Sequence, residues 1–334
     1  MADAAPQTES PPRKPRRKRR WLLRALVCVV LLLIAFELFC RLYLGLGDPP
    51  LIMPDPQIEY LHRPSTSYRR FGHAVGFNAY SMRSPDFAAR KSDHNESRVM
   101  VLGDSIINGG GHTDQTQLAT ELLRTRLQAE WNRPIVVGNI SAGSWGPANL
   151  LAYANKYGLF DADFVVIVLG SQDAGDIPSF DLSGTDSPTR KPLLASIEFA
   201  QRYAPALLRF FASGRKVDVA PTPTGEQIEE SLDALRQLID LSRSRGAMVA
   251  AVLHWERTEL TDNMPHASMN DIRRTLEKRD VPIIDMHDRL RDSILAGREP
   301  FRDYTHPNAV GQQLMCDAIA EWMNQHRPPP HGSG

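Results

Sequence analysis

Cysteine is scarce in this sequence, and the positions of the few cysteines exclude a disulfide framework. Only three cysteines occur among 334 residues, and two of them, Cys28 and Cys40, fall within one apolar segment. Cys316 has no partner in the remainder of the chain, so a scaffold held together by several disulfides is excluded. We expect Cys316 to lie in the core, because Leu314 and Ile319 share the apolar side of the same predicted helix.

Several motifs of nucleotide-binding proteins and enzymes are also missing. There is no Gly-x-Ser-x-Gly elbow, no phosphate-binding loop with its lysine, and no Gly-x-Gly-x-x-Gly after a predicted strand. The glycines at 109–111 lack that spacing, and we expect them to free the loop that follows Ser105. His-Trp-Glu at 254–256 imitates part of a zinc deaminase motif without its Pro-Cys-x-x-Cys partner, so we place it at a strand end near a site rim. We predict no cofactor and no metal.

The main body of the chain has no excess of positive charge. Residues 1–24 hold eight Lys or Arg and two Asp or Glu, which leaves 31 cations against 37 carboxylates in the rest. Binding to nucleic acid requires clustered cations that neutralise phosphates, and the acidic body does not offer them. We therefore predict that nucleic acid is not a partner.

One long hydrophobic run is present, and it predicts a membrane-spanning helix. We assign residues 1–20 to a basic cytoplasmic segment and residues 21–46 to a transmembrane anchor. Glu37 interrupts the run one helical turn before Arg41, with which it can pair. Residues 37–43 lack the small-x-small pattern of a cleavage site, which favours an uncleaved anchor over a signal peptide. The positive-inside rule then places the rest of the chain on the periplasmic or extracytoplasmic side.

The remaining sequence alternates apolar strand-like runs with helical segments. Runs of valine and isoleucine without polar alternation predict parallel strands that are buried on both faces. The predicted strands cover residues 98–102, 134–140, 163–169, 247–253 and 281–285. This pattern predicts an α/β fold, a three-layer α/β/α sandwich with a central parallel sheet.

The sandwich is predicted to be one catalytic domain with less regular segments attached. We assign residues 47–97 to a spacer and lead-in, 98–325 to the domain, and 326–334 to a tail. The insertion at 173–224 interrupts the alternation, with a helix expected over 193–211. It either roofs the site and sets specificity or is merely decorative.

Two short motifs carry the side chains of a nucleophilic site. Gly-Asp-Ser at 103–105 ends an apolar strand and so places Ser105 at the carboxyl edge of the sheet, where open α/β folds bind ligands. Asp303 and His306 are three residues apart, a spacing that lets the carboxylate reach the imidazole. A serine attacks when an imidazole takes its proton, and a carboxylate on the other ring nitrogen orients that imidazole. Each motif alone has a plainer explanation, as a turn or as the start of a helix.

Two intermediate segments complete a resemblance to the SGNH or GDSL hydrolases. Asn-Ile-Ser-Ala-Gly at 139–143 and Gly-Ser-Gln-Asp at 170–173 are similar to the second and third sequence blocks of that family. With the first and last motifs they occur in the order of the family, over residues 98–323. The resemblance implies a flavodoxin-like hydrolase fold.

The resemblance also implies roles for individual residues. Ser105 would be the nucleophile, His306 the general base, and Asp303 the group that orients it. The oxyanion hole would combine the N–H groups of Ser105 and Gly143 with the side-chain amide of Gln172. Gln172 departs from the family pattern, which has asparagine there, and its amide lies one methylene further out.

A stretch before the first block resembles one found in membrane-anchored relatives. Residues 78–83 match an Asn-x-x-Gly-x-Arg pattern, with Ser81 in place of the glycine. We interpret Arg83 as a partner in a structural ion pair, with a functional role as the alternative. Trp145 could line an acyl or sugar pocket, or it could equally serve packing.

From these observations we expect an exported, membrane-anchored serine esterase. It would form an acyl-enzyme with an O-acyl group, most simply acetyl, on a polysaccharide or another envelope substrate. Two alternatives stay open: an O-acetyltransferase that passes the acyl group to a sugar hydroxyl, and a catalytically inert polysaccharide-binding or scaffold module.

Overall fold

A five-stranded parallel sheet forms the centre of the molecule. The computed structural model describes residues 16–182, 188–205, 207–208 and 223–327. All five strands expected from the sequence are present, in the spatial order β6-β5-β7-β8-β9, and each neighbouring pair is parallel. Every residue of β5 and β7 is buried, because helices cover both faces of these strands. The strands are β5 (Ser97–Gly103), β6 (Ile135–Ser141), β7 (Phe164–Leu169), β8 (Met248–Leu253) and β9 (Ile283–Asp285).

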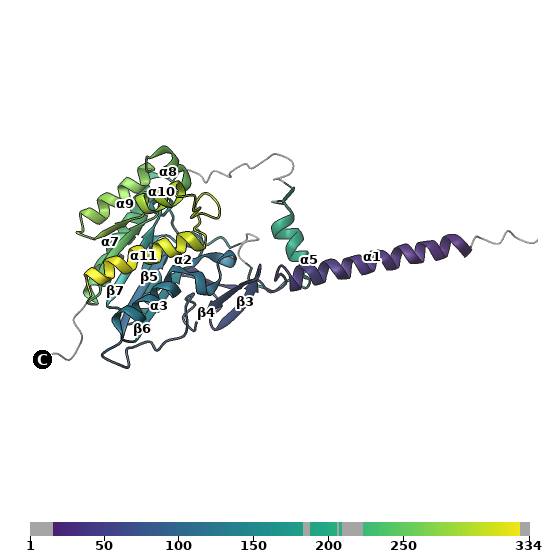
Figure 1. Cartoon of the computed structure of the whole chain (residues 1–334), viewed down its shortest axis with the longest axis horizontal. Coiled ribbons are helices and arrows are strands. Elements are labelled where there is room, and N and C mark those ends of the chain that lie inside the picture. The colour runs from purple at the N-terminus through teal and green to yellow at the C-terminus, as the bar shows by residue number, and fades with distance from the viewer. Residues whose placement is uncertain (1–15, 183–187, 206, 209–222, 328–334) are drawn as a thin grey trace, which may run out of the picture.

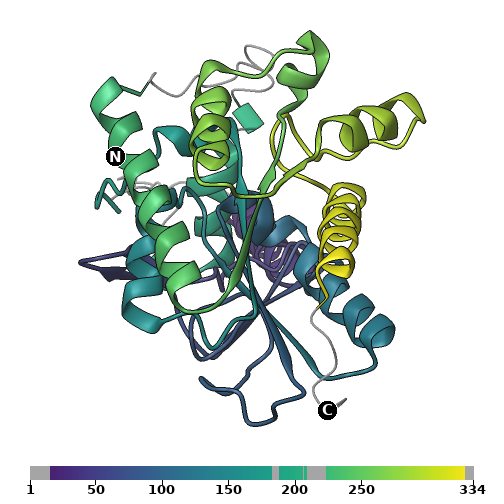
Figure 2. The same ribbon diagram turned by 90° about the vertical axis from the view of Figure 1, so that its left-hand side faces the viewer.

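Helices lie on both sides of the sheet, which confirms the predicted three-layer sandwich. Apolar side chains of α4, α7 and α9 pack on one face, and those of α3, α10 and α11 pack on the other. Figure 2 shows the green helix α7 and the yellow helix α11 on opposite sides of the strands. Cys316, a residue of α11, is buried in the core. The bounds are α3 (Ala119–Trp131), α4 (Pro147–Tyr157), α7 (Gly225–Ser244), α8 (Arg257–Asp262), α9 (Ala267–Glu277), α10 (His287–Leu295) and α11 (Ala309–Gln325).

The direction of winding reverses at β5. The strands β6 and β7 both follow β5 in sequence, yet they lie on opposite sides of it, and the helices that lead to them cover opposite faces. Open α/β folds bind ligands at such a switch point, outside the carboxyl ends of the strands. The short helix α2 (Ser105–Asn108) begins there.

The lead-in at 47–97 is folded into the domain instead of running as a spacer. It forms two antiparallel hairpins, and the residues Ile58 and Leu61 are buried in the same core cluster as α4. Asn149 of α4 also donates a hydrogen bond to the carbonyl oxygen of Ile58 at 2.7 Å. The hairpin strands are β1 (Ile52–Asp55), β2 (Glu59–His62), β3 (Thr66–Arg70) and β4 (His73–Phe77).

A single long helix, α1 (Arg16–Leu42), extends away from the sandwich (Figure 1). Its span Arg19–Leu42 is long enough and apolar enough to cross a membrane, and most of its apolar side chains are exposed, although Cys40 is buried. Arg41 pairs with Glu37 at 2.6 Å, as the sequence indicated. The C-terminal end of α1 packs against α5 (Ala195–Glu198) and the π-helical turn η4 (Phe199–Tyr203).

Some of the sequence predictions fall partly outside the residues that the structure describes. The helix expected over 193–211 is seen through residue 205 and again at 207–208, while 206 and 209–211 are not described. The same holds for residues 1–15 of the basic segment and 328–334 of the tail.

Candidate active site

Ser105 lies where β5 ends and α2 begins. Gly103 leaves no room for a side chain, since a Cβ atom there would lie 2.9 Å from Cγ2 of Ile107. Asp104 caps the short helix, because its Oδ1 accepts a hydrogen bond from the N–H of Ile106 at 2.8 Å. The Gly-Asp-Ser turn therefore fixes Ser105 at the carboxyl edge of the sheet.

The structure brings Ser105, His306 and Asp303 together as the sequence predicted. Oγ of Ser105 lies 2.9 Å from Nε2 of His306, and Nδ1 of His306 lies 3.0 Å from each carboxylate oxygen of Asp303. Burial opposes ionisation of Asp303, but hydrogen bonds from the side chain and N–H of His306 and from the N–H of Thr305 outweigh it and lower its pKa. The ionised carboxylate keeps the proton on Nδ1, which leaves Nε2 free to accept the serine proton.

A buried histidine contacts the loop that carries Asp303 and His306. Nε2 of His254 lies 2.8 Å from the carbonyl oxygen of Thr305, next to His306 in the chain. Burial lowers the pKa of His254 to about 4, so the ring is neutral near pH 7 and its Nε2–H donates to Thr305. The sequence placed His254 near the site rim but gave no sign of this contact, because the two residues lie 51 positions apart.

The other two expected members of the oxyanion hole, Gly143 and Gln172, make different contacts near Ser105. Gly143 lines the same cavity as Ser105, and its carbonyl oxygen accepts a hydrogen bond from the hydroxyl of Tyr60 at 2.5 Å. Nε2 of Gln172 donates to Oδ2 of Asp104 at 2.6 Å, so the longer side chain is held by the residue that precedes the serine. This bond uses one hydrogen of the Gln172 NH₂ group, and the group has a second hydrogen to donate.

Carboxylates gather beside this amide. Burial raises the pKa of Asp104 and raises that of Asp173 well above its usual range, and the Asp104 charge adds to the shift of Asp173. Burial, with the charges of Asp104 and Glu59, raises the pKa of Asp176 to about 7. Asp173 also accepts a hydrogen bond from the N–H of Gly170 at 2.6 Å. The site therefore favours the protonated forms of Asp173 and Asp176 more than an unfolded chain would.

The loop after Ser105 is held by Arg83, which is fully buried. Its guanidinium donates to three backbone carbonyl oxygens, those of Asn108, Gly110 at 2.5 Å, and Thr113 at 2.6 Å. The structural ion pair that we expected for Arg83 is thus wrong, since its short contacts are with carbonyl oxygens. The glycine-rich loop that we expected to be free is held by these hydrogen bonds instead.

The backbone of the turn before Arg83 explains the sequence pattern at residues 78–83. Oδ1 of Asn78 accepts hydrogen bonds from the N–H groups of Tyr80 and Met82, which closes a tight turn. Ser81 within that turn has φ 64°, a left-handed conformation that glycine adopts most easily. This explains why a glycine suits the position and why serine is an unusual replacement.

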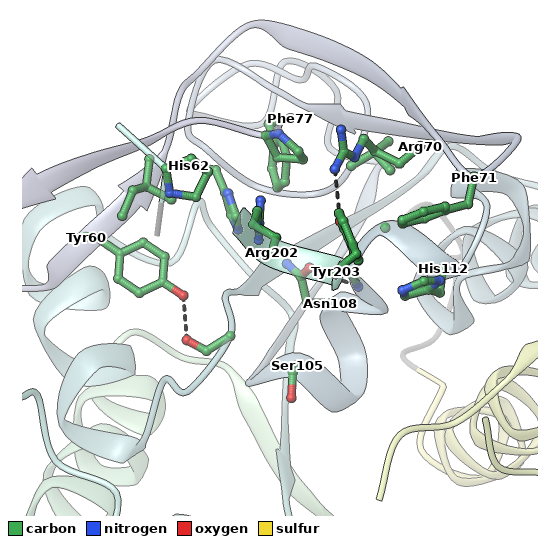
Figure 3. Close-up of a pocket in the computed structure, with 17 residues that line it drawn as sticks. Tyr60, His62, Arg70, Phe71, Phe77, Ser105, Asn108, His112, Arg202 and Tyr203 are labelled. Carbon is green, nitrogen blue, oxygen red and sulfur yellow. Dashed lines mark hydrogen bonds between the residues drawn. The ribbon is translucent and has the colours of Figure 1, made fainter. Parts of the chain in front are cut away.

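A cavity of about 370 Å³ opens beside Ser105 (Figure 3). Aromatic rings form much of its wall, with Tyr60 and His62 on one side of the serine and Phe71 on the other. The hairpins and the insertion both contribute, since Pro188, Arg202 and Tyr203 complete the wall. Trp145 is not part of this lining; it is buried between Tyr60 and Tyr153 in the core.

A buried ion pair joins the two parts of the wall. Nη2 of Arg70, at the end of β3, lies 2.5 Å from Oε1 of Glu198 in α5, and both side chains are 3% exposed. Nη2 of Arg70 also donates to the hydroxyl of Tyr203 at 3.0 Å, and the N–H of Gly47 donates to Oε2 of Glu198 at 2.6 Å. The sequence gives no sign of this pair, because 128 residues separate its members. Within the described part of the chain, no group of His, Cys, Asp or Glu is arranged to hold a metal ion.

Comparison with known proteins gives a family. The sequence profile of the GDSL-like lipase/acylhydrolase family matches residues 101–314. No curated protein matches the chain by sequence.

Among solved structures, a lipase/acylhydrolase from Enterococcus faecalis is 14% identical with a TM-score of 0.44, over 71% of this chain and 100% of that one. The acetyl xylan esterase AlAXEase is 14% identical with a TM-score of 0.43, over 67% and 98%. A two-domain esterase, CEX, active on acetylated mannans, is 13% identical with a TM-score of 0.46, over 72% and 52%.

Proposed function

The chain belongs to the GDSL-like lipase/acylhydrolase family and is an ester-hydrolysing enzyme, and from this premise we propose that it is a membrane-anchored serine esterase with Ser105 as nucleophile. The observation that carries the proposal is the unbroken contact from Ser105 through His306 to Asp303. We assign it O-acyl esters, with O-acetyl groups on an envelope polysaccharide as the substrate.

The proposed reaction has two half-steps. Nε2 of His306 takes the hydroxyl proton as Oγ of Ser105 attacks the ester carbonyl carbon. The N–H groups of Ser105 and Gly143 and the second amide hydrogen of Gln172 would meet the oxyanion. The ester C–O bond then breaks, and His306 returns the proton to the leaving alcohol oxygen. Water, deprotonated by the same imidazole, attacks the acyl-enzyme; the bond from the acyl carbon to Oγ breaks, His306 returns the proton to Oγ of Ser105, and the carboxylic acid leaves.

The cavity lining supports a carbohydrate alcohol as the leaving group. A sugar ring has apolar C–H faces and hydroxyl edges, and the wall offers aromatic rings such as Phe71 and Tyr203 together with polar groups of His62 and Asn108. The same room beside Ser105 would also accept a second sugar, so transfer of the acyl group to a sugar hydroxyl is the competing reaction. The assembled serine, histidine and aspartate argue against an inert binding module.

We further propose that α1 crosses the membrane with its basic N-terminal residues in the cytoplasm. The exposed apolar surface of α1 and the cations that precede it support this orientation. The domain would then lie on the periplasmic or extracytoplasmic side.

The test uses the full chain in detergent micelles, with p-nitrophenyl acetate as substrate. Release of p-nitrophenol should fall to background in Ser105→Ala and stay unchanged in Ser244→Ala, an exposed serine in the last turn of α7. Acetylated oligosaccharide formed in the presence of an added acceptor would assign the chain as a transferase. Equal rates for the wild type and Ser105→Ala would overturn the proposed nucleophile.

A further inference from the structure

One segment of the insertion exposes an unusual amount of apolar surface. Five large apolar side chains are exposed within residues 193–208, with Leu193 89% and Leu208 68% accessible to solvent. They are Leu193, Leu194, Ile197, Leu207 and Leu208. Soluble surfaces rarely concentrate apolar residues in this way, and such patches mark contact with a partner or a membrane.

The opposite face of the same segment holds it on the protein. Ala195 and Glu198 are buried, Glu198 pairs with Arg70, and the hydroxyl of Tyr203, which lines the Ser105 cavity, accepts a hydrogen bond from Arg70. Residues 193–205 and 207–208 are therefore amphipathic, with one side fixed to the domain and the other uncovered. A helix of this type lies with its apolar face in the interface of a bilayer.

The segment is fastened to the C-terminal end of α1. Glu37 accepts hydrogen bonds from the N–H groups of Ala195 and Ser196, each at 2.9 Å, and Arg41 donates to the carbonyl oxygen of Leu193 at 3.1 Å. The rings of Phe36 and Phe199 meet edge to face at 5.5 Å. Figure 1 shows the helix at α5 running crosswise to α1. If α1 crosses a bilayer, this helix lies in the plane of its outer surface.

We propose that the apolar face formed by Leu193, Leu194, Ile197, Leu207 and Leu208 is embedded in the outer interface of the bilayer that α1 crosses. The inference rests on the proposed membrane crossing of α1. The exposed cation Arg190, directly before the apolar face, suits anionic phospholipid headgroups, while Lys191 beside it pairs with Asp48 at 2.8 Å. The contact with Glu37 and Arg41, in the last turns of the apolar span, sets the depth at the headgroup boundary.

This docking fixes where the Ser105 cavity opens. Arg202 and Tyr203 line the cavity from the same segment whose other side contacts lipid. The cavity wall is thus at most one helix diameter, about 10 Å, from the bilayer surface. We infer that the enzyme takes acyl groups or acceptors presented at the membrane surface, such as a lipid-linked glycan.

The test measures quenching of a fluorophore by lipid. The full chain carries Cys28→Ser with one further change, Leu193→Cys, Ile197→Cys or Leu295→Cys, and each new thiol is labelled with an environment-sensitive dye. Leu295 is the matched control, because it is 77% exposed at the end of α10, far from α1 in Figure 1. The proteins are reconstituted in phosphatidylethanolamine and phosphatidylglycerol vesicles that contain a nitroxide-labelled phospholipid.

We expect the dye at Leu193 and Ile197 to be quenched at least about threefold more than the dye at Leu295. A dye on native Cys28, which is exposed in α1, reports the membrane crossing separately. If the dye at Cys28 is quenched while the dye at Ile197 is as accessible to water as the dye at Leu295, the docking alone is overturned. No quenching at Cys28 would overturn both the membrane crossing and the docking that rests on it.

Discussion

Asp303 contacts His306 and not the space beside Ser105, so its role in the proposed mechanism is to position the imidazole. In Asp303→Asn the side chain keeps its size but loses the charge that holds the proton on Nδ1 of His306. We expect kcat/KM for p-nitrophenyl acetate to fall about 10³-fold or more, with the fold retained. Asp240→Asn, which changes a surface partner of Arg279, should leave kcat/KM unchanged. A tenfold effect or less would mean that the imidazole is oriented by other contacts.

Asp176 gives the stability of the protein a pH dependence of unusual sign. Its pKa is about 7 in the folded chain, so the fold retains a proton that an unfolded aspartate releases near pH 4. This stabilisation is complete below about pH 4 and is lost as the pH rises through 7. Asp176→Asn should match the wild type in melting temperature at low pH and exceed it by a few degrees at pH 8, as measured by circular dichroism. Parallel melting curves at both pH values would contradict the shift.

The loop between α2 and α3 depends on one guanidinium because three of its carbonyl groups point at Arg83. Arg83→Lys keeps the charge, but an ammonium group cannot meet three acceptors in the planar arrangement that arginine allows. We expect a loss of about 3 kcal/mol in the free energy of unfolding, measured in urea, and a fall in kcat with little change in KM.

Arg126 on α3 supplies the matched control for this loop. Its ion pairs with Glu130 and Asp317 lie at the surface, so Arg126→Lys should change the free energy of unfolding by less than about 1 kcal/mol. An equally small effect of Arg83→Lys would show that the loop holds itself in place.

Local pattern determined which of these elements could be predicted. Runs of valine and isoleucine predicted the five strands of the sheet, and the Gly-Asp-Ser turn predicted the place of Ser105, because both depend on neighbouring residues. The hairpins between 52 and 77 have strands of four or five residues with proline and charged side chains, which give no clear alternation. The Arg70 contact with Glu198 and the His254 contact with Thr305 join distant residues, and only the folded chain shows them.

The molecule as a whole places three features in succession, and under the proposed membrane crossing of α1 they run from the bilayer outward. First comes α1, then the helix at α5 across its end, and then the Ser105 cavity, whose wall includes Tyr203 (Figures 1 and 3). The ion pair of Arg70 with Glu198 fixes the second feature to the third. Loss of the lipid contact should therefore affect the delivery of substrate and leave the chemistry intact.

We expect two kinds of substrate to respond differently to loss of the lipid contact. In Leu193→Ser/Ile197→Ser/Leu208→Ser, reconstituted as the full chain, hydrolysis of water-soluble p-nitrophenyl acetate should equal that of the wild type, because these side chains do not line the cavity. Hydrolysis of an acetylated glycolipid in the same vesicles should fall about tenfold through a higher apparent KM, since each lost apolar contact weakens interfacial binding. Met264→Ser/Leu295→Ser removes exposed apolar side chains elsewhere and should change neither rate. A triple variant that loses both activities equally would instead point to damage of the cavity wall, and one that keeps both would separate the membrane face from catalysis.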